Sequence, residues 1–387
     1  CVVKKCEANK FDNNTAGNMR RIIMKQIIRY AWIPLLAIGV FACGGNTPPD
    51  SASQGQGNPV GTSVPSGDNT QATAPVERAA TSGGNFLSSF PTDRILSGGV
   101  PKDGIPALTD PQFVDLTSSD ANYVLEDDLI LGVVINGEAK AYPHNMGWWH
   151  EIVNDRVGDT PLLVSYCPLC NSGVVFERVV ETDDGRQNLV FGNTGRLRHF
   201  DMVMYDHMTG SWWQQFTGEA IIGELTGAKL KPLASRVEAF GRFVETHPDG
   251  RVLVPNRPKA RPYGTTPYVR MDTSPGQGLE IYGLPKGVAA FDRVVVVGNE
   301  AWTLKLLREK GIIERDDLVL SWIAGQNSIH DTKFIAYGRD VGNVIVKRLD
   351  AETDEWEDAV HDVTFAFAFK AFVANGTLHM PEPKKED

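Results

Sequence analysis

Two cysteines three positions apart are the clearest chemical feature of this sequence. Cys167 and Cys170 stand in the segment Tyr166-Cys-Pro-Leu-Cys-Asn-Ser172. Two thiols at this spacing can form a small disulfide, exchange electrons by thiolate attack, or bind one metal ion together. The choice among these three chemistries depends on what the chain places around the pair.

The segment after the pair, residues 173–180, is rich in valine and predicts a strand. The helix N-terminus that stabilises a thiolate in thioredoxin-like proteins is therefore not expected here. A Cys-Pro-x-Cys turn between two strands is similar to the metal-binding knuckles of rubredoxins and zinc ribbons. Those sites use a second cysteine pair, so here we expect histidine, methionine or carboxylate side chains to supply the remaining ligands.

Such side chains lie close by in sequence. His150 is the expected imidazole ligand, and Met204 or Glu151 would complete the site. Thiolate, imidazole and thioether groups are soft ligands, which favours copper or zinc over magnesium or calcium. We therefore predict a copper or zinc site formed by the two cysteines and a histidine, used for metal handling or electron transfer.

Two other functions remain open at this point. In a thiol-disulfide oxidoreductase, one cysteine would attack and the other resolve, while His150 or Glu151 moves the proton. In a non-enzymatic ligand-binding or scaffold lipoprotein, Cys167 and Cys170 would form a structural disulfide. The sequence does not decide whether the protein is an enzyme.

Strands are expected to carry these residues. Short runs of Val, Ile, Leu, Phe and Tyr alternate with Gly, Asp, Asn and Pro. Residues 129–142 predict a hairpin with its turn at Asn136-Gly137, and residues 161–166 and 173–180 predict the strands beside the cysteines. The best helical pattern spans Glu300–Lys310 and ends at Gly311. We predict a mainly β (α+β) fold.

The sequence also resembles itself in three places. The matches pair Val134–Ala139 with Val296–Ala301, Leu163–Tyr166 with Val319–Trp322, and Asp206, Thr209 and Trp212 with Asp350, Thr353 and Trp356. We predict two tandem copies of a β-rich unit that form a pseudo-symmetric body. The expected boundaries are residues 87–255 for the first copy, 256–284 for a connecting segment and 285–387 for a degenerate second copy without cysteines.

An export signal precedes this body. Met24 opens a basic stretch, and a 13-residue apolar run from Tyr30 to Ala42 ends at Cys43. The run is short for a membrane-spanning helix. We interpret residues 24–42 as a lipoprotein signal peptide, with lipid on Cys43, and residues 1–23 as non-native upstream translation. A plain secretory signal is the alternative, and both export the protein.

Composition limits the partners. Residues 43–86 are Gly-, Ser-, Thr-, Pro- and Gln-rich and predict a disordered tether. With 48 acidic against 38 basic residues, the net charge of -10 disfavours nucleic acid. We expect a membrane-anchored lipoprotein that faces the periplasm or the cell surface, held to the membrane by lipid on Cys43. Its protein or small-molecule partner is not predicted.

Several segments together resemble one family. They are Asp103–Ala107, Ala141–Pro143, Trp149–Asp155, Tyr166–Ser172, Leu197–Asp206, Thr217–Ala220, Tyr263-Gly264 and Pro267-Tyr268. From about Ile95 onward the chain resembles the DUF3179 family of uncharacterised exported bacterial and archaeal proteins, which brings no established activity. The resemblance implies that His150, Glu151, Cys167, Cys170 and Asp206 occupy motif positions, and Trp149 and Tyr166 are further site candidates in the same blocks.

Overall fold

The computed structural model describes residues 94–276, 279 and 282–382. The predicted leader, the lipidation site Cys43 and the tether lie outside these residues. Within them, no helix is long and apolar enough to cross a membrane. With 43% strand and 14% helix, the chain is mainly β, so this part of the fold prediction is confirmed.

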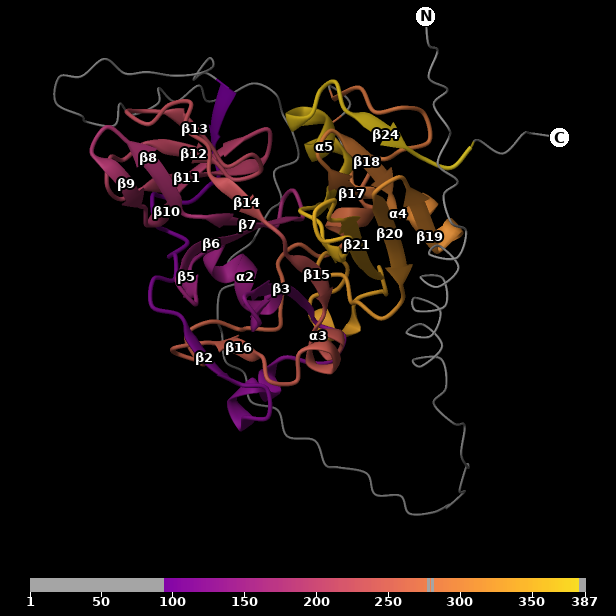
Figure 1. Cartoon of the computed structure of the whole chain (residues 1–387), viewed down its shortest axis with the longest axis horizontal. Coiled ribbons are helices and arrows are strands. Elements are labelled where there is room, and N and C mark those ends of the chain that lie inside the picture. Colours follow the sequence, from indigo (N-terminus) through magenta and orange to yellow (C-terminus); the bar gives the residue numbers. More distant parts are fainter. Residues whose placement is uncertain (1–93, 277–278, 280–281, 383–387) are drawn as a thin grey trace, which may run out of the picture. The chain divides into compact units, whose positions relative to one another are not determined.

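Five sheets of four or five strands form a propeller-like ring (Figure 1). Sheet A has the order β15 (Arg236–Ala239), β3 (Leu129–Ile135), β4 (Glu138–Pro143), β16 (Arg251–Val254) and β2 (Gln112–Asp115). Sheet B has the order β14 (Lys231–Leu233), β7 (Ser172–Glu177), β6 (Thr160–Cys167) and β5 (Ile152–Val157). Sheet C has the order β1 (Ile95–Ser97), β10 (Phe191–Arg198), β11 (Asp201–Asp206), β12 (Trp212–Gln214) and β13 (Glu219–Ile222).

The C-terminal part of the chain forms the other two sheets. Sheet D has the order β23 (Asp362–Phe365), β17 (Arg293–Val297), β18 (Glu300–Thr303) and β24 (Thr377–His379). Sheet E has the order β19 (Ile312–Arg315), β20 (Leu318–Ile323), β21 (Asn343–Leu349) and β22 (Trp356–Asp358). The remaining elements are the hairpin β8 (Val179–Thr182) and β9 (Gly185–Asn188), and the helices η2 (Ser119–Tyr123), α2 (His144–His150), α3 (Phe240–Thr246), η3 (Met271–Thr273), α4 (Leu304–Lys310), η5 (Ile335–Tyr337) and α5 (Ala366–Phe372).

The local sequence explains where these elements turn. Asn136 and Gly137 have φ of 50° and 82°, which is the two-residue turn predicted between β3 and β4. The helix predicted over residues 300–310 is correct only in its second part. Glu300–Thr303 pairs with β17 as a strand, and the Thr303 hydroxyl then accepts a hydrogen bond from the Leu306 N–H and caps α4.

The four strands of sheet D are arranged like β15, β3, β4 and β16 of sheet A, which has β2 in addition. In each, a hairpin (β3–β4 or β17–β18) gains one antiparallel strand and, on its other side, one parallel strand. Sheets B and E are both antiparallel and built from four strands. Apart from β1, the strands of sheet C lie in the sequence between β7 and β14, two strands of sheet B. The corresponding strands of sheet E, β21 and β22, are joined directly by residues 350–355, which contain no strand.

Two of the three sequence matches lie on corresponding strands of these sheets, and the third does not. The first lies on β3–β4 and β17–β18, and the second on β6 and β20, which hold corresponding places. The third pairs a turn of sheet C with a turn of sheet E, which do not correspond. These two segments share only a local turn. The Asp206 carboxylate accepts from the Thr209 N–H, and the Asp350 carboxylate accepts from the Thr353 N–H in the same way.

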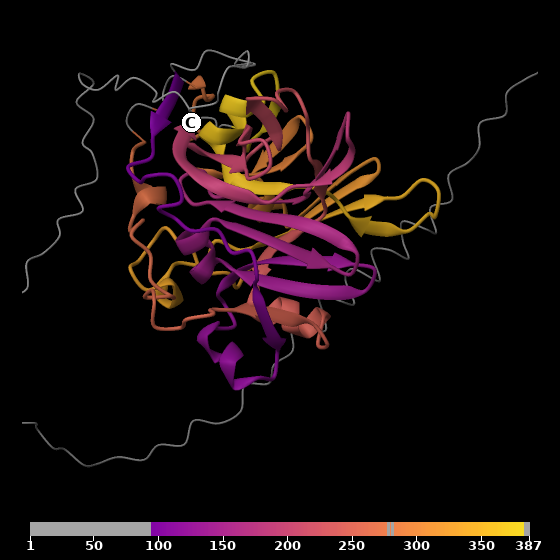
Figure 2. The same cartoon turned by 90° about the vertical axis from the view of Figure 1, so that its left-hand side faces the viewer.

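One hydrophobic core unites the early and late parts of the chain. It contains Leu131, Tyr166, Val295 and Leu320, which come from sheets A, B, D and E. The helix α5 also packs against sheet C, where the Phe372 ring stacks on Phe216 at 4.8 Å. Both views show this yellow C-terminal segment beside the magenta strands (Figures 1 and 2).

Candidate functional site

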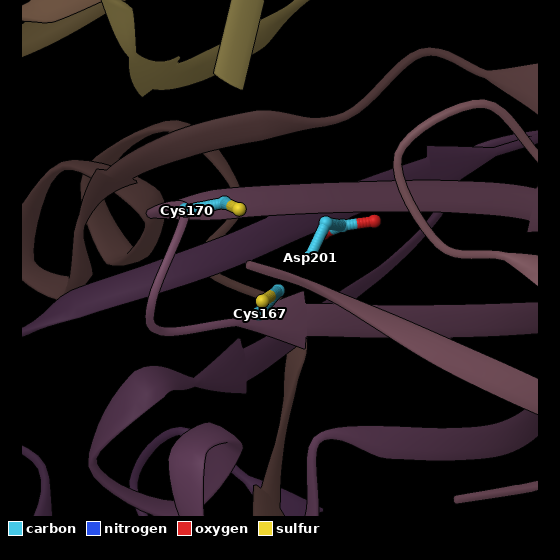
Figure 3. Close-up of side chains that lie close together, drawn as sticks. All are labelled: Cys167, Cys170 and Asp201. Atoms are coloured by element: carbon cyan, nitrogen blue, oxygen red, sulfur yellow. The ribbon is translucent and has the colours of Figure 1, made fainter. Parts of the chain in front are cut away.

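Cys167, Cys170 and Asp201 meet in the interior of the protein. Each offers one ligand atom, and the three atoms lie within 4.8 Å of one another (Figure 3). Both thiols are free and buried, and Asp201 has no exposed surface. Two sulfurs and a carboxylate oxygen at this separation could hold a metal ion.

Strand pairing places the two cysteines. Cys167 is the last residue of β6, opposite Ser172 at the start of β7, and Cys170 lies in the turn between them. Asn171 closes this turn with φ of 53°, in the left-handed region. The Tyr166 hydroxyl donates to the Asn171 side-chain oxygen at 3.3 Å, so the residue before the first cysteine helps to fix the turn.

A second tight turn places Asp201. Arg198 at the end of β10 pairs with Asp201 at the start of β11, leaving only His199 and Phe200 to reverse the chain. Both have positive φ, 52° and 63°, where asparagine and glycine are the usual residues. Strained backbone of this kind concentrates at functional sites. It brings the Phe200 carbonyl oxygen to 3.7 Å from the Cys167 sulfur.

Only one of the two Asp201 carboxylate oxygens accepts hydrogen bonds from N–H groups. Its Oδ2 accepts hydrogen bonds from the Gln214 amide at 2.5 Å and the Phe216 N–H at 3.0 Å. Its Oδ1, by contrast, is buried and accepts from no N–H or O–H group among the described residues. Burial raises the pKa of Asp201 from 3.8 to about 7, which the hydrogen bonds from Phe216, Gln214 and the two thiols partly oppose. Burial also raises the pKa of both thiols.

Two more carboxyl groups surround the cluster. Burial raises the pKa of Glu151 to about 8, although the Asn193 amide donates to it at 2.6 Å. Glu151 ends α2 with φ of 58°. Burial likewise raises the pKa of Asp362 to about 7, and that carboxylate accepts from the Ser172 hydroxyl at 2.6 Å. The site thus combines two thiols with three acids from separate elements, an arrangement that favours a bound cation.

The structure does not bring His150 into this cluster. Its Nδ1 lies 2.9 Å from the Pro106 carbonyl oxygen, and its Nε2 lies 3.2 Å from the Tyr263 hydroxyl. The charge of the next residue, Glu151, contributes to the raised pKa of Cys167. Met204 is fully buried in the same hydrophobic cluster as the two cysteines.

The remaining candidates have local contacts. Asp206 accepts from the Trp213 indole N–H at 2.9 Å and from Thr209, and so fixes the turn between β11 and β12. The guanidinium of Arg261 lies 5.2 Å from the Trp149 ring. Neither Asp206 nor Trp149 joins the thiol cluster. Each is therefore better explained by its turn or its surface contact.

The sequence alone did not place Asp201 beside the thiols. It stands in a hairpin far along the chain from Cys170, and no local spacing links the two. Asp362 was missed for the same reason, because it belongs to sheet D. Two signals were present in the sequence. Asp201 lies within the Leu197–Asp206 block of the family resemblance, and it follows His199-Phe200, two bulky residues in a turn that requires positive φ.

The comparison with known families matches this description. A family model described as a protein of unknown function, DUF3179, matches residues 102–376. The chain belongs to the DUF3179 family. The resemblance inferred from the sequence motifs is therefore confirmed. No curated protein and no solved structure matches the chain, so the function of this DUF3179 protein must be argued from its site.

Proposed function

We propose that this DUF3179 protein binds one soft metal ion, zinc or copper, through Cys167, Cys170 and Asp201. The observation that carries the proposal is the buried Asp201 Oδ1, which lies beside two free thiols and accepts from no N–H or O–H group of the described residues. A buried carboxylate oxygen without such a donor is costly, and a metal ion would satisfy it.

The donor set favours zinc. Thiolates bind both zinc and copper(I), whereas a carboxylate oxygen suits zinc better than copper(I). Zinc would use both sulfurs and Asp201 and leave a fourth position for Glu151 or water. Copper(I) would use the two sulfurs alone. Zinc binding corresponds to metal handling, because zinc has no redox chemistry, and copper would allow electron transfer.

Metal binding also fits the electrostatics better than thiol exchange does. A reactive cysteine needs a lowered pKa and access to its substrate. Here both thiols are buried, and burial raises the pKa of each. A metal ion would compensate the charge of both thiolates, which would lose their protons as it binds.

Export and membrane attachment remain proposals from the sequence. The basic stretch after Met24, the apolar run and Cys43 support a lipid-anchored protein on the outer side of the membrane. Expression of the Cys43→Ala variant should move the protein from the membrane fraction to the soluble exported fraction. Retention of the variant in the membrane fraction would contradict lipid anchoring.

We also infer that sheets A and B and sheets D and E descend from one duplicated unit. The shared strand order supports this, and so do two reciprocal contacts. The Asn171 amide beside β7 donates to the Val363 carbonyl of β23 at 2.8 Å, and the Asn343 oxygen of β21 accepts from the Ala239 N–H of β15 at 2.6 Å. An experimental structure in which β3–β7 did not superpose on β17–β21 would contradict the duplication.

Metal content is the direct test of the function. The chain is purified without chelators, its zinc and copper are measured by mass spectrometry, and its free thiols are counted after unfolding. We expect one metal ion per chain, lost in Cys167→Ser and Asp201→Asn and retained in His150→Gln. The His150 variant is the matched control, because that side chain is buried nearby but outside the cluster. No metal after incubation with zinc and copper under reducing conditions would refute the proposal.

A further inference from the structure

The turn that carries the thiols is held by residues from the distant C-terminal half. The Cys170 carbonyl oxygen accepts from the Phe365 N–H at 2.9 Å and from the Thr364 hydroxyl at 2.7 Å. The Asp362 carboxylate accepts from the Gly173 N–H at 3.1 Å, one strand residue beyond the turn. Strand β23 of sheet D therefore fixes the second half of the turn.

His330 fixes the first half. Its ring has no exposed surface, and its Nε2 lies 2.7 Å from the carbonyl oxygen of Pro168, between the two cysteines. The Arg293 guanidinium lies 3.4 Å from the other ring nitrogen and can only donate. The Nε2 atom therefore carries the proton and donates to Pro168. Burial lowers the pKa of His330 to about 3, so the ring stays neutral.

An ion pair holds His330 in this orientation. Arg293 is bound by Asp272 at 2.8 Å, and its guanidinium also donates to the Ser328 hydroxyl at 2.9 Å. The Ser328 hydroxyl in turn accepts from the backbone N–H of His330 at 3.1 Å. Charge-assisted bonds of this kind are short and directional. The imidazole therefore cannot turn away from Pro168 without also losing its contact with the Arg293 guanidinium.

His330 lies in a connection that corresponds to the thiol-bearing turn. It lies in residues 324–342, which connect β20 to β21 in sheet E. Residues 168–171 connect β6 to β7 at the corresponding place in sheet B. The connection in sheet E contains no cysteine. It is longer, and it reaches across to the thiol-bearing turn.

We propose that His330 is a positioning residue of the metal site: it holds the Pro168 peptide group so that Cys167 and Cys170 present both sulfurs to one ion. This inference rests on the proposed metal function. Residues that hydrogen-bond to the ligand-bearing backbone orient the ligands before the ion arrives, and their loss lowers metal affinity by about 10–100-fold. The C-terminal half thus orients the two thiols of the site through His330, although it contributes no thiol itself.

Three variants test the role of His330 in the full chain. His330→Leu keeps much of the volume and removes the donor, whereas His330→Gln retains an N–H that can reach the same carbonyl. His379→Leu is the control in the same half, because that ring packs on Trp302 at 4.9 Å and bonds to Glu300, away from the turn. Zinc affinity is measured by competition with a chromophoric chelator, and cobalt(II) binding by its sulfur-to-metal charge-transfer band.

We expect His330→Leu to lower zinc affinity by about 10–100-fold and to shift the cobalt band, with His330→Gln close to the wild-type protein and His379→Leu unchanged. Wild-type affinity in His330→Leu would overturn the positioning role and leave the metal site intact. Equal losses in His330→Leu and His330→Gln would also overturn it, because the hydrogen bond would not matter. Failure of the wild-type protein to bind zinc, copper or cobalt would instead refute the metal function itself.

Discussion

Replacement of His144 by leucine should make the protein more resistant to acid. The His144 ring is 2% exposed and lies edge-on against Tyr166, with ring centroids 4.1 Å apart. Burial lowers its pKa from 6.5 to about 3, and the nearby His330 adds to this effect. The folded protein therefore leaves this imidazole neutral at a pH where the unfolded chain protonates it. Falling pH favours unfolding.

The magnitude follows from the two pKa values. A pH of about 4 lies about 2.5 units below the pKa of 6.5 in the unfolded chain, so the unfolded imidazole is protonated there while the folded one is still neutral. This difference in protonation lowers the free energy of unfolding by about 3 kcal/mol relative to about pH 7. The stability present above pH 6.5 is lost as the pH falls toward 3. His144→Leu removes this loss, so the difference in unfolding free energy between variant and wild type should shift by about 3 kcal/mol in favour of the variant.

Urea unfolding followed by circular dichroism at both pH values measures this shift. The packing cost of the substitution is the same at both pH values, and the titration of the other groups is common to both proteins, so both contributions cancel in the difference. His207→Leu, which removes an exposed imidazole, is the matched control for the effect of burial. A shift below about 1 kcal/mol for His144→Leu would refute the reasoning that this histidine is buried and neutral.

Three further outcomes follow from the packing. Gly195→Ala should lower the free energy of unfolding in urea by about 2 kcal/mol or more, because the φ of Gly195 is 69° and the added methyl group would clash with a main-chain oxygen. A variant as stable as the wild-type protein would contradict this. Cys167 and Cys170 should resist iodoacetamide in the native metal-free protein and react after unfolding, and rapid native alkylation would support thiol exchange instead. Alanine substitutions at Arg236 and Asp358, whose paired bonds are both 2.8 Å, should show a coupling of about 1 kcal/mol in a double-mutant cycle; independent effects would contradict a stabilising pair.

The sequence predicted the elements that depend on local pattern. The hairpin at Asn136-Gly137 and the strands beside the cysteines follow from turn chemistry and β-branched residues, which act over a few positions. The limit of such reasoning appears at Glu300–Thr303. These residues fit a helical period, but pairing with β17 makes them a strand, because long-range pairing overrides a weak local preference.

The ligand set could not be predicted in the same way. His150 was the expected imidazole ligand because it is near the cysteines in sequence and lies in a family motif, yet its ring nitrogens meet Pro106 and Tyr263. Asp201 reaches the thiols only because sheet C packs on sheet B. Contacts between sheets depend on the whole chain, and one sequence contains no record of which distant residues will meet.

The asymmetry of the site follows from the same packing. Under the duplication proposed above, each half could carry one thiol turn, and the connection between β20 and β21 occupies the corresponding place. The proposed carboxylate ligand, however, comes from sheet C, whose strands after β1 lie between β7 and β14. The C-terminal half has only residues 350–355 at that point, so cysteines introduced near Asn327 would find no counterpart of Asp201. In the metal site proposed here, two thiols without that carboxylate would form a weaker site, which would account for a second connection that contacts the first turn through His330 instead of binding metal itself.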